Sequence, residues 1–211
     1  MHLQVHEKVP HGIRQRQAAS HSAAGSRDAL RWMLALVDDH DRYTGSHSRR
    51  VSSYADSISR VMGLAGAHIA MIRKAALLHD IGKVAIPQTV LRKEDVLDDQ
   101  ETAMVRLHPV LSASIITRVK GLQPLVPAIL HHHEMWDGTG YPEGLAGNAI
   151  PLESRIILVA DSFDAMTSIR TYTETRSPAE AMREIEKWSG QQFDPIVVAG
   201  ARRTFDMGLL G

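Results

Sequence analysis

The sequence contains no cysteine, which excludes disulfides, thiolate metal ligands and cysteine nucleophiles. It also lacks net charge, because 24 basic side chains balance 24 acidic ones, so no global positive field attracts nucleic acid or an anionic membrane. No apolar run approaches the roughly 20 residues that span a bilayer. The first letters, MHLQVHEKVPHG, lack the apolar core of a signal peptide. We therefore expect a cytoplasmic protein that binds neither a DNA or RNA polymer nor a membrane.

Aromatic side chains are few and histidines are many: the 211 residues include 3 Phe and 4 Tyr but 12 His. A hydrophobic content of 44% suits one globular domain with a sizeable core, which we assign to residues 27–211. Residues 1–26 are polar and without periodicity, so we predict a flexible arm there. The arm holds four histidines that we expect to take no part in chemistry: His2, His6, His11 and His21.

Helical spacing of apolar residues dominates the rest of the chain. It predicts helices over 30–37, 49–64, 67–82, 109–119, 124–134, 151–169, 177–188 and 194–205. The run RIILVA at 155–160 alone would also fit a buried strand, but the apolar spacing continues beyond it at the helical period. No useful alternation of period two occurs. The expected fold is an all-α bundle with a long irregular, Gly-rich loop at about 137–150.

The first chemically interesting motif is LLHDIGKVAIP, in which Gly82 ends an apolar helix just after His79 and Asp80. Adjacent helical residues point about 100° apart, so this pair suits one ion less well than two ions. An Asp carboxylate can bridge two metals about 3.5–4 Å apart. A solvated Asp at a helix end beside a core His is the plain alternative, and these two residues alone leave it open.

Further potential ligands lie far away in the sequence. His47 could be a surface residue, His108 could end a helix, and His132 and His133 could belong to a tract that scavenges metal. Asp161 is harder to dismiss, because a charge within an apolar stripe needs a partner. Imidazoles and carboxylates without thiolates suit a hydrolytic two-metal centre of Fe, Mn or similar ions, and this set of ligand types also admits Zn, Co and Ni.

HDIGKVAIP, followed about 50 residues later by HHEMWDGTGYPEGLAGNAIP, closely resembles the HD-GYP branch of the HD phosphohydrolase superfamily. The resemblance extends from about Asp38 to Val198 and includes DRYTGSHSRRV, RIILVADSFDAMTS and GQQFDP. It implies an all-helical HD-domain bundle. It also implies hydrolysis of cyclic di-GMP to pGpG and in some members to GMP, while some relatives prefer cyclic GMP-AMP.

The resemblance also implies roles for individual residues. Asp80 would bridge two metals, and Lys83 would contact the scissile phosphate, which makes both catalytic. Gly140, Tyr141 and Arg170 would contact the substrate, and the Tyr141 loop would also contact signalling proteins. A homodimer is compatible with this reading. The implied metal ligands are His47, His79, Asp80, His108, His132, His133 and Asp161.

Some positions are spectators or departures from the family pattern. His131 precedes the matching His pair and is expected to bind no metal. Members with a third metal have Glu where this chain has Tyr43, so two ions are expected. Arg170 is followed by Thr-Tyr-Thr instead of Pro-Tyr and a basic residue, which puts substrate affinity in question. Ser112 stands where the family usually has Gly.

Three functions compete at this point. The first is a cyclic dinucleotide phosphodiesterase. The second is an interaction module that binds partners through the Tyr141 loop with little turnover. The third is a phosphohydrolase of another nucleotide, against which the GYP letters argue. The complete set of expected metal ligands favours the phosphodiesterase.

Overall fold

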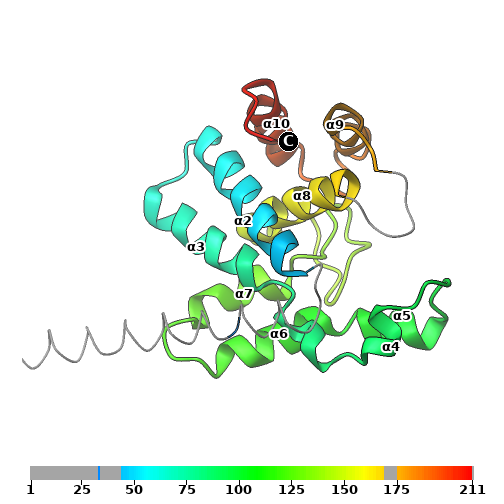
Figure 1. Cartoon of the computed structure of the whole chain (residues 1–211). Coiled ribbons are helices and arrows are strands. Elements are labelled where there is room, and N and C mark those ends of the chain that lie inside the picture. Colours follow the sequence, from blue (N-terminus) through cyan, green and yellow to red (C-terminus); the bar gives the residue numbers. More distant parts are fainter. Residues whose placement is uncertain (1–32, 34–43, 169–174, 211) are drawn as a thin grey trace, which may run out of the picture.

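The computed structural model describes residues 33, 44–168 and 175–210. Within them it is all-α, as predicted, with one isolated β-bridge between Ser189 and Phe193 in place of any strand. Figure 1 shows the arrangement of the helices. They are α2 (Thr44–Val61), α3 (Gly66–Leu78), α4 (Gln88–Leu91), α5 (Asp99–Val105), α6 (His108–Thr117), α7 (Val126–Leu130), α8 (Leu152–Thr167), α9 (Pro178–Lys187) and α10 (Pro195–Asp206), with 3-10 turns η1 (Ile81–Ala85), η2 (Gln123–Leu125) and η3 (Gly147–Ala149).

Helix α8 runs through the middle of the molecule and explains the ambiguous apolar run. It packs against α2, α7, α9 and α10, so the successive residues Ile156, Ile157 and Leu158, which point about 100° apart, are all buried. A helix that is surrounded in this way reads as continuously apolar and loses the pattern of a surface helix. Charged groups inside it, such as Asp161, therefore sit at the centre of the fold.

The predicted helices are present in the described residues, but several of their ends differ. Helix α2 begins at Thr44, five residues before the predicted start at 49. The segment 67–82 stays α-helical only to Leu78, and the HD pair lies in the break before η1. The segment 124–134 forms the end of η2 and the short α7, and residues 131–133 make a turn. His108 begins α6, so the alternative in which it ends a helix is wrong. The predicted helix 30–37 lies outside the described residues apart from Met33, as does the predicted arm.

Two helices, α4 and α5, were not expected from the sequence, and in Figure 1 they extend to one side of the bundle. Helix α5 begins with a capping box: the Asp98 side chain accepts from the Glu101 amide at 2.8 Å, and Glu101 accepts from the Asp98 amide at 2.9 Å. This is the same signature that predicted α9 correctly from Ser177 and Glu180. None of the described helices is both long and apolar enough to cross a bilayer.

Candidate metal centre

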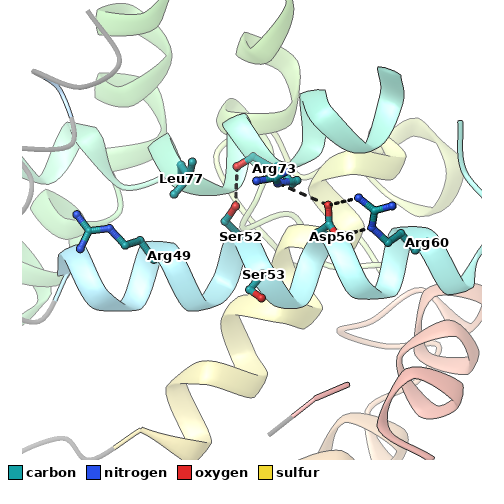
Figure 2. A pocket seen from close by; sticks show the side chains of 7 residues that line it. All are labelled: Arg49, Ser52, Ser53, Asp56, Arg60, Arg73 and Leu77. Atoms are coloured by element: carbon teal, nitrogen blue, oxygen red, sulfur yellow. Dashed lines mark hydrogen bonds and ion pairs between the residues drawn. The ribbon is translucent and has the colours of Figure 1, made fainter. Parts of the chain in front are cut away.

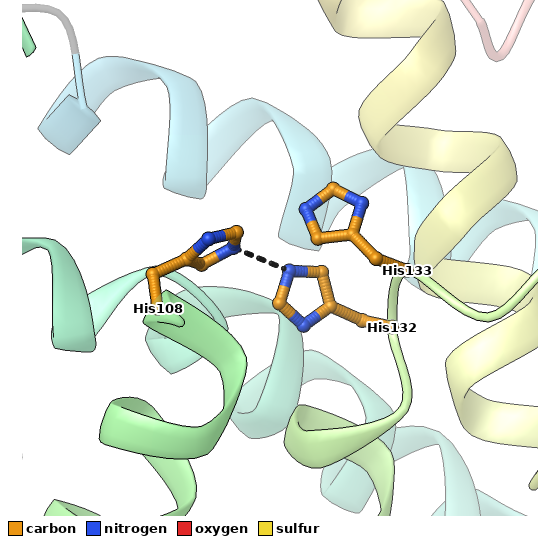
Figure 3. A group of neighbouring side chains, drawn as sticks. All are labelled: His108, His132 and His133. Atoms are coloured by element: carbon orange, nitrogen blue, oxygen red, sulfur yellow. Dashed lines mark hydrogen bonds between the residues drawn. The ribbon is translucent and has the colours of Figure 1, made fainter. Parts of the chain in front are cut away.

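Seven side chains that the sequence singled out converge where α2, α3, α6, α7 and α8 meet. His47 comes from α2, Asp161 from α8, and the others from the ends of helices or the turns next to them. Six of the seven form two groups of three, in which one ligand atom from each residue lies within 4.8 Å of the others. One group is His47, His79 and Asp80, and the other, shown in Figure 3, is His108, His132 and His133.

The carboxylate of Asp80 connects the two groups. Its Oδ1 lies 3.2 Å from His108 Nε2, and its Oδ2 lies 3.4 Å from His79 Nε2 and 3.8 Å from His47 Nε2. Asp161 approaches the same His47 nitrogen to 3.2 Å. Because both carboxylates lie within 3.8 Å of the same nitrogen, they are closer together than the roughly 10 Å that would rule out a shared two-metal centre.

Three histidines are fixed in one tautomer by the backbone. In each, Nδ1 donates a hydrogen bond to the carbonyl oxygen three residues earlier, so Nε2 carries a lone pair. The bonds are His79 to Ala76 at 2.7 Å, His108 to Val105 at 2.7 Å and His132 to Ile129 at 2.6 Å. This Nδ1 anchoring aims three acceptor nitrogens into the space between the helices.

The converging acceptors fit a cation. The Nε2 atoms of His108 and His132 are 3.2 Å apart, but neither carries a hydrogen in this tautomer, so they do not hydrogen-bond to each other. Oδ1 of Asp80 is buried and has no hydrogen-bond partner. Lone pairs that face each other in a buried site repel unless a positive charge lies among them. The residues present therefore suit divalent metal ions with nitrogen and oxygen ligands.

The titration of these groups also favours metal binding. Burial lowers the pKa of His108 and His132 and lowers that of His133 to about 4, so these imidazoles are neutral near pH 7. Burial alone would raise the pKa of Asp80, but His79 and Lys83 hold it well below its usual value. Neutral imidazoles and an ionised carboxylate are the forms that bind metals.

The orientation of His47 is set by Asp164, a residue that no motif in the sequence marked. The Asp164 carboxylate accepts a hydrogen bond from His47 Nδ1 at 2.7 Å and is held in turn by Arg50 Nε at 2.5 Å. Burial would lower the pKa of His47, but its hydrogen bonds with Asp161 and Asp164 raise it to about 9. The sequence signal was a second Asp three residues after Asp161 in an apolar helix.

The Gly-rich loop is organised around Glu134, another residue without an assigned role. Its buried carboxylate accepts from the Glu143 amide at 2.7 Å and the Leu145 amide at 3.0 Å. Gly138 and Gly144 have positive φ angles of 85° and 68°, a backbone conformation that favours glycine over residues with a side chain. The loop is thereby folded back onto the chain that immediately follows the His pair.

Gly140 and Tyr141 lie directly against His133. A Cβ atom on Gly140 would be 2.2 Å from the Met135 amide nitrogen and 2.5 Å from the His133 carbonyl oxygen, so only glycine fits. The Tyr141 amide donates to that carbonyl at 3.2 Å, and its ring stacks on the His133 ring. The guanidinium of Arg106 lies 5.4 Å from the centre of the Tyr141 ring.

Of the other residues that the sequence marked, Lys83 and His131 lie beside the two groups. The Lys83 ammonium lies 2.6 Å from Asp80 Oδ2. His131 belongs to neither ligand group, and its Nδ1 is 3.7 Å from Glu134 Oε1. Arg170 and Tyr43 lie outside the described residues.

A separate hollow of about 390 Å³ lies between α2 and α3, away from these groups (Figure 2). Asp56 binds Arg60 there at 2.5 Å and approaches Arg73 at 3.5 Å. Because Asp56 pairs with two of the arginines and none of the seven converging residues lines the hollow, the candidate metal centre is elsewhere. The hollow is lined by Arg49, Ser52, Ser53, Asp56, Arg60, Arg73 and Leu77.

Comparison with known proteins agrees with this geometry. A cyclic di-GMP phosphodiesterase of Thermotoga maritima is 39% identical over 173 residues, which are 81% of this chain and 47% of that protein. The 3'3'-cGAMP-specific phosphodiesterase 2 of Vibrio cholerae is 38% identical over 175 residues, which are 82% of this chain and 34% of that protein. The chain thus spans less than half the length of either relative.

Solved structures share the fold. That of a cyclic GMP-AMP specific phosphodiesterase of Vibrio cholerae matches with a TM-score of 0.64 at 21% identity, covering 90% of this chain and 50% of that one. The family model described as HD domain matches residues 31–197, which include all seven converging side chains. The chain therefore belongs to the HD domain family, in its HD-GYP branch.

Proposed function

We propose that this chain is a metal-dependent phosphodiesterase that hydrolyses cyclic di-GMP to pGpG and onward to GMP in bacterial second-messenger signalling. The observation that carries the proposal is the position of the Asp80 carboxylate, which faces both groups of histidines in a buried site. The similarity of this chain to a Thermotoga maritima protein that is named a cyclic di-GMP phosphodiesterase supports the same reaction class.

Two divalent ions, Fe or Mn, suit the available ligands. His47, His79 and Asp161 would hold one ion, His108, His132 and His133 would hold the other, and Asp80 would contact both. When bound, such a pair supplies an activated water and neutralises charge on the phosphate. This chain's own hydrogen bonds fix the orientation of the ligand imidazoles. Mn and Fe are preferred over softer ions because nitrogen and oxygen are the only donors.

Substrate contacts would come from the edge of the centre. Lys83 would add positive charge at the phosphate, because its ammonium lies beside Asp80 at the edge of the proposed centre. Gly140 and Tyr141 would offer backbone and ring surface, and Arg170 a second cation. The Tyr141 loop would also be the contact for signalling proteins. We place the chain in the bacterial cytoplasm, with a homodimer as the assembly to test.

The decisive experiment compares the metal-loaded wild type with Asp80→Asn. We expect the wild type to carry close to two Fe or Mn per chain by elemental analysis and to release pGpG and GMP from cyclic di-GMP. Asp80→Asn should lose metal and at least about 10²-fold in rate. Asp206→Asn, which alters an exposed carboxylate on α10, is the matched control and should change neither. A fully loaded wild type without turnover would make the interaction module the better account.

A second candidate substrate is cyclic GMP-AMP, which is favoured by the match to the Vibrio cholerae enzyme. The two substrates differ in one base, so the same centre would serve both. The ratio of kcat/KM values for cyclic di-GMP and cyclic GMP-AMP decides between them. A ratio above one supports the primary proposal, and a ratio below one replaces it with the second.

A further inference from the structure

A buried hydroxyl on α6 forms hydrogen bonds with both ends of the turn that carries His79 and Asp80. Ser112 is fully buried, and its Oγ donates to the His79 carbonyl oxygen at 2.8 Å while it accepts from the Gly82 amide at 2.8 Å. The two backbone groups lie on either side of Asp80. One side chain therefore closes the turn that carries His79 and Asp80 against the helix that carries His108.

The contact between the turn and the helix is very close. A Cβ atom on Gly82 would lie 2.3 Å from the His108 carbonyl oxygen, 2.5 Å from the Ser112 amide nitrogen and 2.8 Å from Ser112 Oγ. Nothing larger than glycine fits between them. The hydroxyl therefore acts at the place where the two backbones meet, and its hydrogen bonds satisfy polar groups that are shielded from water.

The same contact governs the position of two side chains in the centre. The peptide group of the His79 carbonyl leads directly into Asp80, and His108 lies one helical turn before Ser112. Asp80 Oδ1 and His108 Nε2 are 3.2 Å apart, so a small shift of the turn relative to α6 would separate them. Ligand distances in metal sites are held to within about 0.2 Å, so such a shift weakens binding.

We propose that Ser112 is a positioning residue of the metal centre, whose hydroxyl fixes Asp80 relative to His108 so that both can hold the same ion. The inference rests on the proposed function for the existence of the metals. It goes beyond that function because Ser112 contacts neither an ion nor a substrate, and because the family resemblance implies Gly at this position. The Ser112 hydroxyl therefore forms two hydrogen bonds that a glycine at this position could not form.

The test compares Ser112→Ala with Ser59→Ala. Ser59 is also a fully buried serine, but its hydroxyl bonds only to the Ala55 carbonyl of its own helix at 2.6 Å. Loss of a supporting hydrogen bond costs roughly 10–100-fold in metal affinity or activity. We expect Ser112→Ala to bind Mn(II) about 10-fold or more weakly in a chelator competition, with KM for cyclic di-GMP unchanged. Ser59→Ala should lower the melting temperature without changing Mn(II) affinity.

An isosteric pair keeps the test decisive if Ser112→Ala fails to fold. Ser112→Thr and Ser112→Val introduce side chains of nearly the same shape, so both add the same bulk to the site and only Thr keeps the hydroxyl. The Val variant should bind Mn(II) about 10-fold or more weakly than the Thr variant. Equal Mn(II) affinities in Thr and Val, or wild-type affinity in Ser112→Ala, would overturn the positioning role.

Failure of this inference is distinct from failure of the proposed function. A wild type that binds Mn(II) and hydrolyses cyclic di-GMP, with Ser112→Ala equal to it, rejects only the role of Ser112. If the wild type binds metal but hydrolyses no cyclic dinucleotide, the phosphodiesterase proposal is rejected. The Mn(II) affinities of the Ser112 variants still test the positioning role in that case. A wild type that binds no divalent ion rejects the metal centre and the positioning role together.

Discussion

The rings of Tyr141 and His133 are stacked, with centroids 4.9 Å apart and planes inclined by 21°. This contact joins the Gly-rich loop to one of the proposed metal ligands. The backbone reinforces it, because the Tyr141 amide also donates to the His133 carbonyl. A protein or substrate that moves the loop would therefore change the orientation of the imidazole at the same time.

The stacking predicts an effect of the ring itself on metal binding. Aromatic pairs contribute about 0.5–1.5 kcal/mol beyond the area they bury, which corresponds to roughly two- to tenfold in affinity. Tyr141→Ala should lose this much Mn(II) affinity, and Tyr141→Phe, which keeps the ring, should lose almost none. Chelator competition with both variants measures the difference. Identical affinities in the two variants would show that the stack does not hold His133.

The three consecutive histidines should behave differently from each other. His131 belongs to neither ligand group, whereas His132 is buried within one. We expect His131→Ala to keep the metal content of the wild type and His132→Ala to reduce it, as measured by elemental analysis after dialysis. Removal of the four arm histidines should leave the content unchanged. Equal losses from both sets would indicate unspecific binding by a histidine tract.

The convergence of the proposed metal ligands could be predicted, because imidazole and carboxylate side chains are directly recognisable in the sequence. Asp161 stands out in an apolar run, and the fold confirms that α8 is buried on several sides. The roles of Asp164 and Glu134 were not predictable, because each acts through a hydrogen bond to a residue that only the tertiary structure brings near. Ser112 was noted as a departure, but its two partners lie 30 and 33 residues away.

Lys83 should matter for the reaction but not for metal content. Its ammonium pairs with Asp80 at 2.6 Å, and Lys93 pairs with Glu101 at the same distance, which makes Lys93 a matched control. Lys83→Ala should keep both ions and lose about 10²-fold in kcat, because one electrostatic contact to the transition state is removed. Lys93→Ala should retain full rate. Metal loss in Lys83→Ala would instead assign the lysine to site assembly.

Asp164 should support the metal centre through His47. Asp164→Asn keeps the shape of the side chain but removes the charge that orients His47 Nδ1–H. We expect metal affinity to fall roughly 10–100-fold, the usual cost of losing a residue that orients a ligand. Asp56→Asn, which alters a carboxylate that is paired with arginine in the hollow of Figure 2, is the control and should have no effect. Unchanged metal affinity in Asp164→Asn would show that the orientation of His47 by Asp164 does not contribute to metal binding.

Metal binding should release a proton near neutral pH. The pKa of His47 is raised to about 9 in the metal-free protein, so this imidazole is protonated at pH 7.5 and must lose its proton to bind an ion. The pKa values of His132 and His133 are lowered, so these residues release none. Calorimetry in two buffers of different ionisation enthalpy should give about one proton per chain. The release should vanish as the pH rises through 9, and buffer-independent heats at pH 7.5 would contradict it.

Helix ends were harder to predict than helix interiors. The letters of 124–134 fit one helix, but α7 stops at Leu130 and His132 turns back to cap the carbonyl of Ile129. A side chain that competes for a backbone carbonyl ends the helix, and helical periodicity does not register that competition. Helix α5 was missed because its seven residues are too short for a clear apolar period, although Asp98 and Glu101 carry its start signal.

The Nδ1 anchoring of His79, His108 and His132 also has a thermodynamic consequence. Each imidazole is held by the backbone carbonyl three residues earlier before any ligand arrives, so its rotational freedom is given up when the chain folds. An incoming ion then has no rotamer entropy of these rings left to remove, and more of the energy of its bonds becomes affinity. The cost appears in folding instead: the protein without ions must confine converging lone pairs that a flexible site would have kept apart.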